Sequence, residues 1–150
     1  MKDSDGVNLL RKDRNSRGGG VAIAFDSKNA SFEKMKLSAM SACDFEIVVA
    51  KGKLNGKHKG HIVVSCYLPP AYNKTKTSEF FEKLIDVISE AKAKNPDCWL
   101  TVGGDWNGKS LQGLLEAYPE LVPLDSGPTR KNATLDIIIT NYKDLSLIHI

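Results

Sequence analysis

The chain has 150 residues, of which 41% are hydrophobic and 26% are charged. This length and composition fit one globular domain with a core of its own, and they exclude an intrinsically disordered chain and a mini-protein built on disulfides. The net charge is +3, with 17 basic and 12 acidic side chains in residues 1–100 against 4 and 6 in residues 101–150. A basic body with an acidic end fits a polyanionic substrate beside a metal site, although ordinary surface variation gives the same pattern.

The cysteine pattern and the hydropathy indicate the cellular compartment of the protein. Cys43, Cys66 and Cys98 are widely spaced and form no CxxC pair. An odd number of cysteines in a chain without an apolar signal region predicts reduced thiols in an intracellular protein. No apolar run approaches the ~18 residues that a membrane span needs, so we expect a soluble protein with no membrane partner.

Strand-like segments dominate the first half of the chain. After a charged start, the run GGGVAIAF (residues 18–25) predicts a strand introduced by flexible glycines, whereas residues 26–42 indicate no clear class. Residues 44–53 and 61–68 predict the two strands of a hairpin, with Asn55-Gly56 as the turn signal. Glu46 alternates with apolar residues in the first of these strands, so we interpret it as a strand residue.

The connection between these two strands is basic. Lys51, Lys53, Lys57 and Lys59 follow one another there without an acidic residue among them. A solvated loop is the simplest interpretation, and contact of Lys57 and Lys59 with a phosphate backbone is the alternative.

The second half alternates helices and strands. Apolar residues recur at intervals of three and four in residues 78–94, which predicts an amphipathic helix with Ser78 as its N-cap. Residues 98–104 then predict a buried strand, residues 110–118 a short helix and residues 134–141 a further strand.

The segment GGDWNGKS, residues 103–110, matches the pattern G-x-x-x-x-G-K-[ST] of a phosphate-binding P-loop. The residues that satisfy the pattern are Gly103, Gly108, Lys109 and Ser110. A P-loop wraps closely around phosphate, and inside that wrap Asp105 would repel the anion and Trp106 would crowd it. A P-loop nucleotide-binding module is therefore the weaker alternative.

The same segment supports a hydrolytic interpretation. Asp105 and Asn107 are two residues apart after a buried strand, so a carboxylate that accepts a proton or binds a metal stands beside a carboxamide that donates to phosphate. A capping turn would use the same two residues. Strand-GGDWN resembles the GDxN motif of the endonuclease/exonuclease/phosphatase superfamily, which includes deoxyribonuclease I.

Further motifs follow in the order found in that superfamily. SCYLPP (residues 65–70) is similar to its strand ending in a tyrosine and prolines, and the resemblance implies that Tyr67 binds the substrate phosphate. TLDIIITN (residues 134–141) is similar to its late strand, in which the aspartate, here Asp136, orients a catalytic histidine. GPTR (residues 127–130) and the early GGGVAIAF run look most like the endonuclease domain of non-LTR retrotransposons.

The resemblance implies an α+β fold, in which two β-sheets form a sandwich flanked by helices in four layers, α/β/β/α, as in deoxyribonuclease I. It also implies a Mg²⁺- or Mn²⁺-dependent endonuclease that nicks DNA in the nucleus. We expect a monomeric domain that belongs to a longer polypeptide with a reverse transcriptase. Asp105, Asn107, Tyr67 and Asp136 would be catalytic, and Lys57, Lys59 and Arg130 would contact DNA.

Two parts of the superfamily's site have no counterpart here. The superfamily places an Asn and a metal-binding Glu before the GGGVAIAF segment, but residues 1–17 contain no glutamate, so the metal ligand is unassigned and Asp105 is the candidate. The superfamily closes on Ser-Asp-His, but here His149 follows Ile148. We therefore expect residues 1–150 to form one partial domain with weak or absent hydrolysis, or a non-catalytic nucleic-acid-binding remnant. The ending LSLIHI (residues 145–150) resembles a translated adapter sequence, and a native tail is the alternative.

Overall fold

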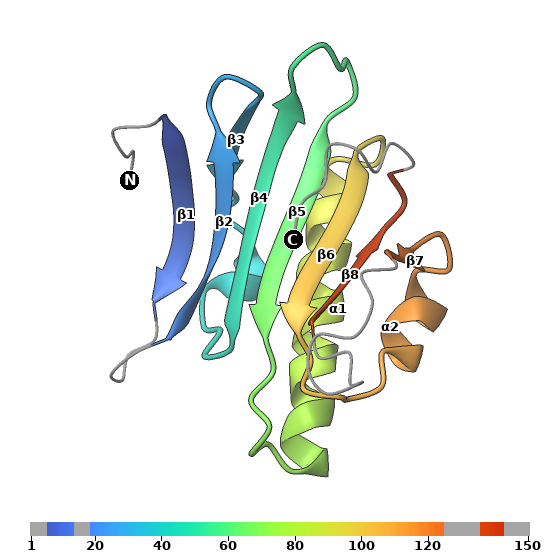
Figure 1. Ribbon diagram of the computed structural model, residues 1–150. Helices are drawn as coiled ribbons and strands as arrows, with labels where there is room; N and C mark the ends of the chain where they lie inside the picture. The colour runs from blue at the N-terminus through green and yellow to red at the C-terminus, as the bar shows by residue number, and fades with distance from the viewer. Residues whose placement is uncertain (1–5, 14–18, 125–135, 143–150) are drawn as a thin grey trace.

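The computed structural model describes residues 6–13, 19–124 and 136–142 (Figure 1). In chain order the elements are β1 (Val7–Asp13), β2 (Gly20–Asp26), β3 (Ala30–Lys34), the 3-10 helix η1 (Ser38–Met40), β4 (Glu46–Leu54), β5 (His61–Tyr67), α1 (Lys74–Lys94), β6 (Trp99–Asp105), α2 (Gln112–Ala117), β7 (Val122–Pro123) and β8 (Asp136–Thr140). Arg130, His149 and the tail at 145–150 lie outside the described residues.

The strands form two sheets. One has six strands in the order β3-β4-β5-β6-β8-β7, and the other is the antiparallel pair β1-β2. Within the larger sheet only β5 and β6 are parallel. A parallel pair needs a crossover connection, and helix α1 supplies it behind the sheet in Figure 1. As a result, β5 and β6 both end at the same edge of the sheet.

The two faces of the large sheet are covered differently. Helices α1 and α2 pack on one face, where the main core forms from buried residues such as Phe80, Leu84, Val64 and Leu100. The β1-β2 pair covers part of the other face, and a second, smaller core lies between the two sheets. The buried members of this second core are Val21, Ile23, Val48 and Ala50. The expected α+β fold with two stacked sheets is confirmed, and both described α-helices lie on the outer face of the large sheet.

Most expected elements are present, but helix α1 begins earlier than the sequence predicted. The helix starts at Lys74, and its N-cap is Asn73, whose side chain accepts a hydrogen bond from Lys76 N at 2.8 Å. The expected cap, Ser78, lies inside the helix. The first turn is polar and carries no apolar periodicity, which is why the pattern located only the later, core-facing part.

Three strands were not expected from the sequence. Strand β1 is mostly polar, yet all seven of its residues pair with β2. Lys12 Nζ also donates to the carbonyl oxygens of Cys43 and Phe45, at 2.7 and 2.6 Å. Strands β3 and β7 are short edge strands. These segments are therefore strands because they pair with residues elsewhere in the chain, and the local sequence alone does not favour a strand.

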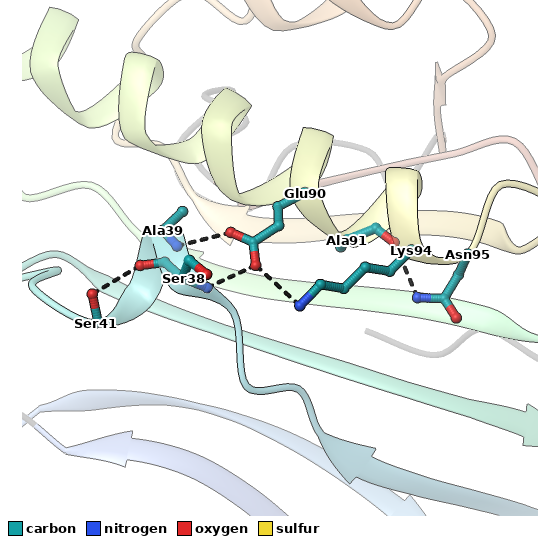
Figure 2. Close-up of polar contacts among 7 residues, drawn as sticks. All are labelled: Ser38, Ala39, Ser41, Glu90, Ala91, Lys94 and Asn95. Atoms are coloured by element: carbon teal, nitrogen blue, oxygen red, sulfur yellow. Dashed lines mark hydrogen bonds and ion pairs between the residues drawn. The ribbon is translucent and has the colours of Figure 1, made fainter.

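Helix α1 is joined to η1 by a carboxylate (Figure 2). Glu90 accepts hydrogen bonds from Ser38 N at 2.7 Å and Ala39 N at 2.8 Å, and it pairs with Lys94 at 3.3 Å. The backbone hydrogen bonds from Ala39 and Ser38 hold the pKa of Glu90 below its usual value, and Lys94 lowers it further. Glu90 thus caps the start of η1 from a different element.

Buried polar side chains connect three strands near the start of β5. His61 Nε2 lies 2.6 Å from Thr101 Oγ1, which lies 2.8 Å from Thr140 Oγ1. Thr140 Oγ1 donates to Leu100 O at 3.1 Å and accepts from Tyr142 N at 3.0 Å. Burial lowers the pKa of His61 to about 4, so the imidazole is neutral at pH 7.

All three cysteines are free. Within the described ranges, no helix is both long enough and apolar enough to cross a membrane.

Candidate active site

Three of the four catalytic residues expected from the sequence lie in one row across the large sheet. Tyr67 at the end of β5 is the Cα partner of Asp105 at the end of β6, and Asp105 is the partner of Asp136 at the start of β8. Residues opposite one another in a sheet project to the same face, and their Cβ atoms are about 5 Å apart. Tyr67 packs against the core between the two sheets, so the row faces the β1-β2 side.

The fourth expected residue, Asn107, is fixed beside this row by its own backbone and side chain. Asn107 N donates to Asp105 Oδ1 at 3.1 Å, and Asn107 Nδ2 donates to Leu68 O at 2.8 Å. The residue has a φ of 49°, in the left-handed region that asparagine tolerates better than most residues. The carboxamide therefore links the turn after β6 to the segment after β5, and its second N–H has no partner among the described residues.

Trp106 anchors the turn from the core side. Its side chain is 1% exposed, and its Nε1 donates to Ile137 O at 3.0 Å. The indole also stacks on Phe81 of helix α1, with ring centroids 6.0 Å apart and planes 8° apart. The residue between Asp105 and Asn107 thus points into the helix-side core, which turns its two polar neighbours away from that core.

The P-loop interpretation is wrong for this segment. Gly103 and Gly104 are paired on both sides within β6, with β5 and with β8, so they form a strand and not a phosphate-wrapping loop. The glycines serve close packing instead. A Cβ on Gly104 would lie 2.8 Å from Cys66 O, and one on Gly103 would lie 3.2 Å from Ile138 Cγ1.

A cavity of about 620 Å³ lies between β2 and the strands β5, β6 and β8. Asp105 and Asp136 line it at one end of the strands, and His61 and Thr101 line it at the other. Its walls between these ends are largely apolar, with Ile23 among the residues from β2. The two carboxylates of the row therefore border an open space between the sheets.

The row has a fourth member that the sequence analysis did not assign to the site. Glu46, the first residue of β4, is the Cα partner of Tyr67, so its side chain shares the face of Tyr67, Asp105 and Asp136. The sequence correctly predicted Glu46 as a strand residue. Its place in the row depends on the register of the β4-β5 hairpin, and the turn at Asn55-Gly56 was the available signal.

The row can be tested for its fit to a metal ion. Within the described ranges, no group of three or more His, Cys, Asp or Glu side chains could hold a metal. Mg²⁺ often binds through only one or two carboxylates, keeping several waters and adding substrate phosphate oxygens. Asp105 and Asp136 on adjacent strands supply two hard oxygen donors of this kind. The donor set therefore fits a largely hydrated Mg²⁺.

The expected DNA-contacting residues are not brought to this row. Lys57 and Lys59 lie in the β4-β5 connection, at the opposite end of β5 from Tyr67 (Figure 1). The seven residues of β5 separate the two ends by about 20 Å at ~3.3 Å per residue. The third expected contact, Arg130, lies outside the described residues.

No family model matches the chain, and no curated protein matches it. Solved structures do. The endonuclease domain of TRAS1, a telomere-specific non-LTR retrotransposon, superimposes with a TM-score of 0.64 at 22% identity over 97% of this chain. A protein of the endonuclease/exonuclease/phosphatase family from Bacteroides thetaiotaomicron superimposes with a TM-score of 0.62 at 10% identity over 91% of the chain. The chain has the endonuclease/exonuclease/phosphatase fold.

A third solved structure also shares this fold. D. rerio TDP2, solved with a single-strand DNA product, matches with a TM-score of 0.65 at 11% identity over 93% of this chain. The chain spans 71% of the TRAS1 domain, 61% of the Bacteroides protein and 63% of TDP2. The resemblance stated from the sequence motifs is confirmed at the level of the fold, including its likeness to a retrotransposon endonuclease.

Proposed function

We propose that the chain is part of a metal-dependent endonuclease that hydrolyses phosphodiester bonds in DNA. The observation that carries the proposal is the row of Tyr67, Asp105 and Asp136 across three adjacent strands, with Asn107 hydrogen-bonded to Asp105. Two carboxylates, a phenol and a carboxamide at one edge of a sheet suit phosphate chemistry. The fold shared with endonucleases and phosphatases supports the same class of reaction.

Each residue has a role in this proposal. Asp105 accepts the proton of the attacking water, while the Tyr67 hydroxyl and the second N–H of Asn107 donate to the non-bridging phosphate oxygens. Asp105 and Asp136 would hold Mg²⁺, which supplies stabilisation of the charge that develops on the phosphate and the leaving oxygen. In the superfamily's pattern Asp136 instead orients a histidine, which would then contact the phosphate in its place.

We expect the chain to be a slow enzyme. The residues of a hydrolytic site act as a unit, so loss of one member removes most of the rate. Residues 1–17 contain no glutamate that could match the superfamily's metal ligand, and His149 follows Ile148 where the superfamily has Asp-His. The retrotransposon context, a reverse transcriptase in the same polypeptide and action in the nucleus belong to this proposal as well.

Nicking of supercoiled plasmid tests the proposal. The protein is incubated at high concentration with Mg²⁺ or Mn²⁺, beside Asp105→Asn and the matched control Asp97→Asn, an exposed aspartate before β6. We expect slow formation of open circles by the wild type and the control, with loss in Asp105→Asn and on addition of chelator. Nicking by Asp105→Asn at the wild-type rate would contradict the proposal, and so would equal background in all three proteins.

A further inference from the structure

Lysines gather at the end of the sheet opposite the candidate active site. We call this surface the basic edge, defined by Lys28 in the β2-β3 turn and by Lys53, Lys57 and Lys59 in and beside the β4-β5 hairpin. All four side chains belong to exposed residues. The hairpin from Lys51 to Gly60 contains no acidic residue.

The two turns of the basic edge are bonded to each other, so their lysines are held as one surface. Asn55 N donates to Asn29 O at 2.8 Å, and the Asn55 side chain donates to Lys28 O. Gly56 has a φ of 79°, which closes the tip of the hairpin, and Lys57 N donates to Leu54 O at 3.1 Å. A preformed cationic surface loses little conformational freedom when it binds an anion.

An aromatic ring lies beside these charges. Lys59 Nζ is 3.8 Å from the ring centroid of Trp99, the half-buried first residue of β6. Trp99 N also donates to Gly60 O at 2.9 Å, so strand β6 fixes the end of the hairpin. Lysine beside a partly exposed tryptophan is a combination typical of surfaces that contact nucleic acid.

Within the described part of the chain, few acidic side chains lie near this surface. Asp26 is engaged by the β2-β3 turn, where it accepts from Lys28 N at 2.9 Å and from Asn29 Nδ2 at 3.1 Å. Glu33 lies opposite Lys51 on β3, further along the strand. Asp97 is the remaining acid close to Trp99 in the sequence. Among the described residues, the lysines of the basic edge therefore outnumber the acidic side chains beside them.

We propose that the basic edge is a nucleic-acid-binding surface separate from the Tyr67-Asp105-Asp136 row. It contacts the phosphate backbone without reading the sequence, because lysines on a hairpin provide charge and no fixed pairing with base edges. The surface lies about 20 Å from the row by the rise of β5. Binding there does not require hydrolysis, so this proposal does not depend on the proposed function.

Fluorescence anisotropy of a short labelled DNA duplex, measured in chelator to prevent hydrolysis, tests the proposal. The variant Lys53→Gln/Lys59→Gln is compared with the control Lys34→Gln/Lys36→Gln, which removes the same charge from exposed lysines away from the hairpin. We expect the hairpin variant to raise Kd roughly tenfold near physiological salt and to reduce the slope of log K against log salt by about 2, since each phosphate contact contributes ~0.9. Equal effects of the two variants, or wild-type binding without salt dependence, would overturn the proposal.

Two further measurements separate this surface from its alternatives. Binding should quench the fluorescence of Trp99, so Trp99→Phe should lose most of the quenching that the wild type shows, and unchanged quenching would place the DNA elsewhere. Poly-glutamate should compete more weakly than unlabelled duplex of the same charge concentration, and competition as strong as that of the duplex would identify an acidic peptide as the partner and overturn the assignment to nucleic acid.

Discussion

Asp105 and Asp136 lie directly opposite each other on adjacent antiparallel strands. Like charges in that position repel and weaken a sheet, by roughly 0.2–1 kcal/mol for a cross-strand pair. The fold therefore keeps two carboxylates where its own stability would favour another pair. Such a conflict between stability and sequence is a mark of functional sites.

The first prediction concerns this pair. Asp136→Asn should stabilise the protein by about 0.5 kcal/mol, because it removes the repulsion with Asp105 and preserves the shape of the side chain. Urea denaturation at neutral pH and low salt measures the change in the free energy of unfolding. Asp97→Asn is the control, and an equal gain there would mean that the effect comes from net charge. A loss of stability in Asp136→Asn would contradict the prediction.

The second prediction concerns His61. Burial holds its pKa near 4, below the 6.5 of an unfolded histidine, so the unfolded chain binds more protons between these values. Stability is fully present above pH 6.5 and falls as the pH drops toward 4, by an amount on the order of 3 kcal/mol for such a shift. Urea denaturation at pH 7 and pH 5 tests this.

His61→Gln is the variant that isolates this term. It keeps a side chain that can hydrogen-bond Thr101 but does not titrate, so it should show a smaller loss of stability between pH 7 and pH 5 than the wild type. An unchanged pH dependence would assign the effect to other groups.

The third prediction concerns Glu90. Its pKa is lowered in the folded state by the hydrogen bonds from Ala39 and Ser38, so its contribution is present above the unfolded pKa and is lost as the pH falls through the folded value. Glu90→Gln should lower the thermal midpoint at pH 7 and flatten its decline in acid. Glu79→Gln, which removes an exposed carboxylate 4.0 Å from Lys76, should change the midpoint little. Equal shifts in the two variants would contradict a specific role of the contact in Figure 2.

The fourth prediction concerns Trp106. Trp106→Ala should destabilise the protein by about 3–5 kcal/mol, because it leaves a cavity against Phe81 and removes the hydrogen bond to Ile137. Trp106→Phe should keep most of the packing and lose the hydrogen bond, at about 1 kcal/mol or somewhat more. Chemical denaturation of both variants measures the difference, and similar losses for the two would mean that the hydrogen bond dominates.

The sequence predicted the parts of the fold whose neighbours are local. The apolar runs of β2, β4, β5 and β6 and the periodicity of α1 indicate element type because each pattern repeats within a few residues. The polar strand β1 has no such pattern, and it exists because β2 pairs with it along its whole length. Nothing within β1 itself could have indicated that pairing.

The sequence predicted which residues belong to the candidate site, but it did not predict how they are arranged in space. Tyr67, Asp105, Asn107 and Asp136 were named from motifs, each attached to its own segment. The row itself depends on the register between strands distant in sequence, and so does the place of Glu46 in it. Lys57 and Lys59 show the same limit. Their basic run indicates an anion-binding surface, but it does not indicate at which end of the sheet that surface lies.

The buried chain of His61, Thr101 and Thr140 has a consequence for the opposite edge of the sheet. Thr101 and Thr140 are Cα partners on the same two strands that carry Asp105 and Asp136, and their hydroxyls are 2.8 Å apart. A slip of β8 by a single residue would turn Asp136 toward the helices and could bring Ile137 into the row in its place. The same slip would break the contact between the two threonines and leave hydroxyls unsatisfied in the interior. The hydrogen bond between Thr101 and Thr140 therefore fixes the register of β6 and β8, and this register keeps Asp105 opposite Asp136 at the other end of the two strands.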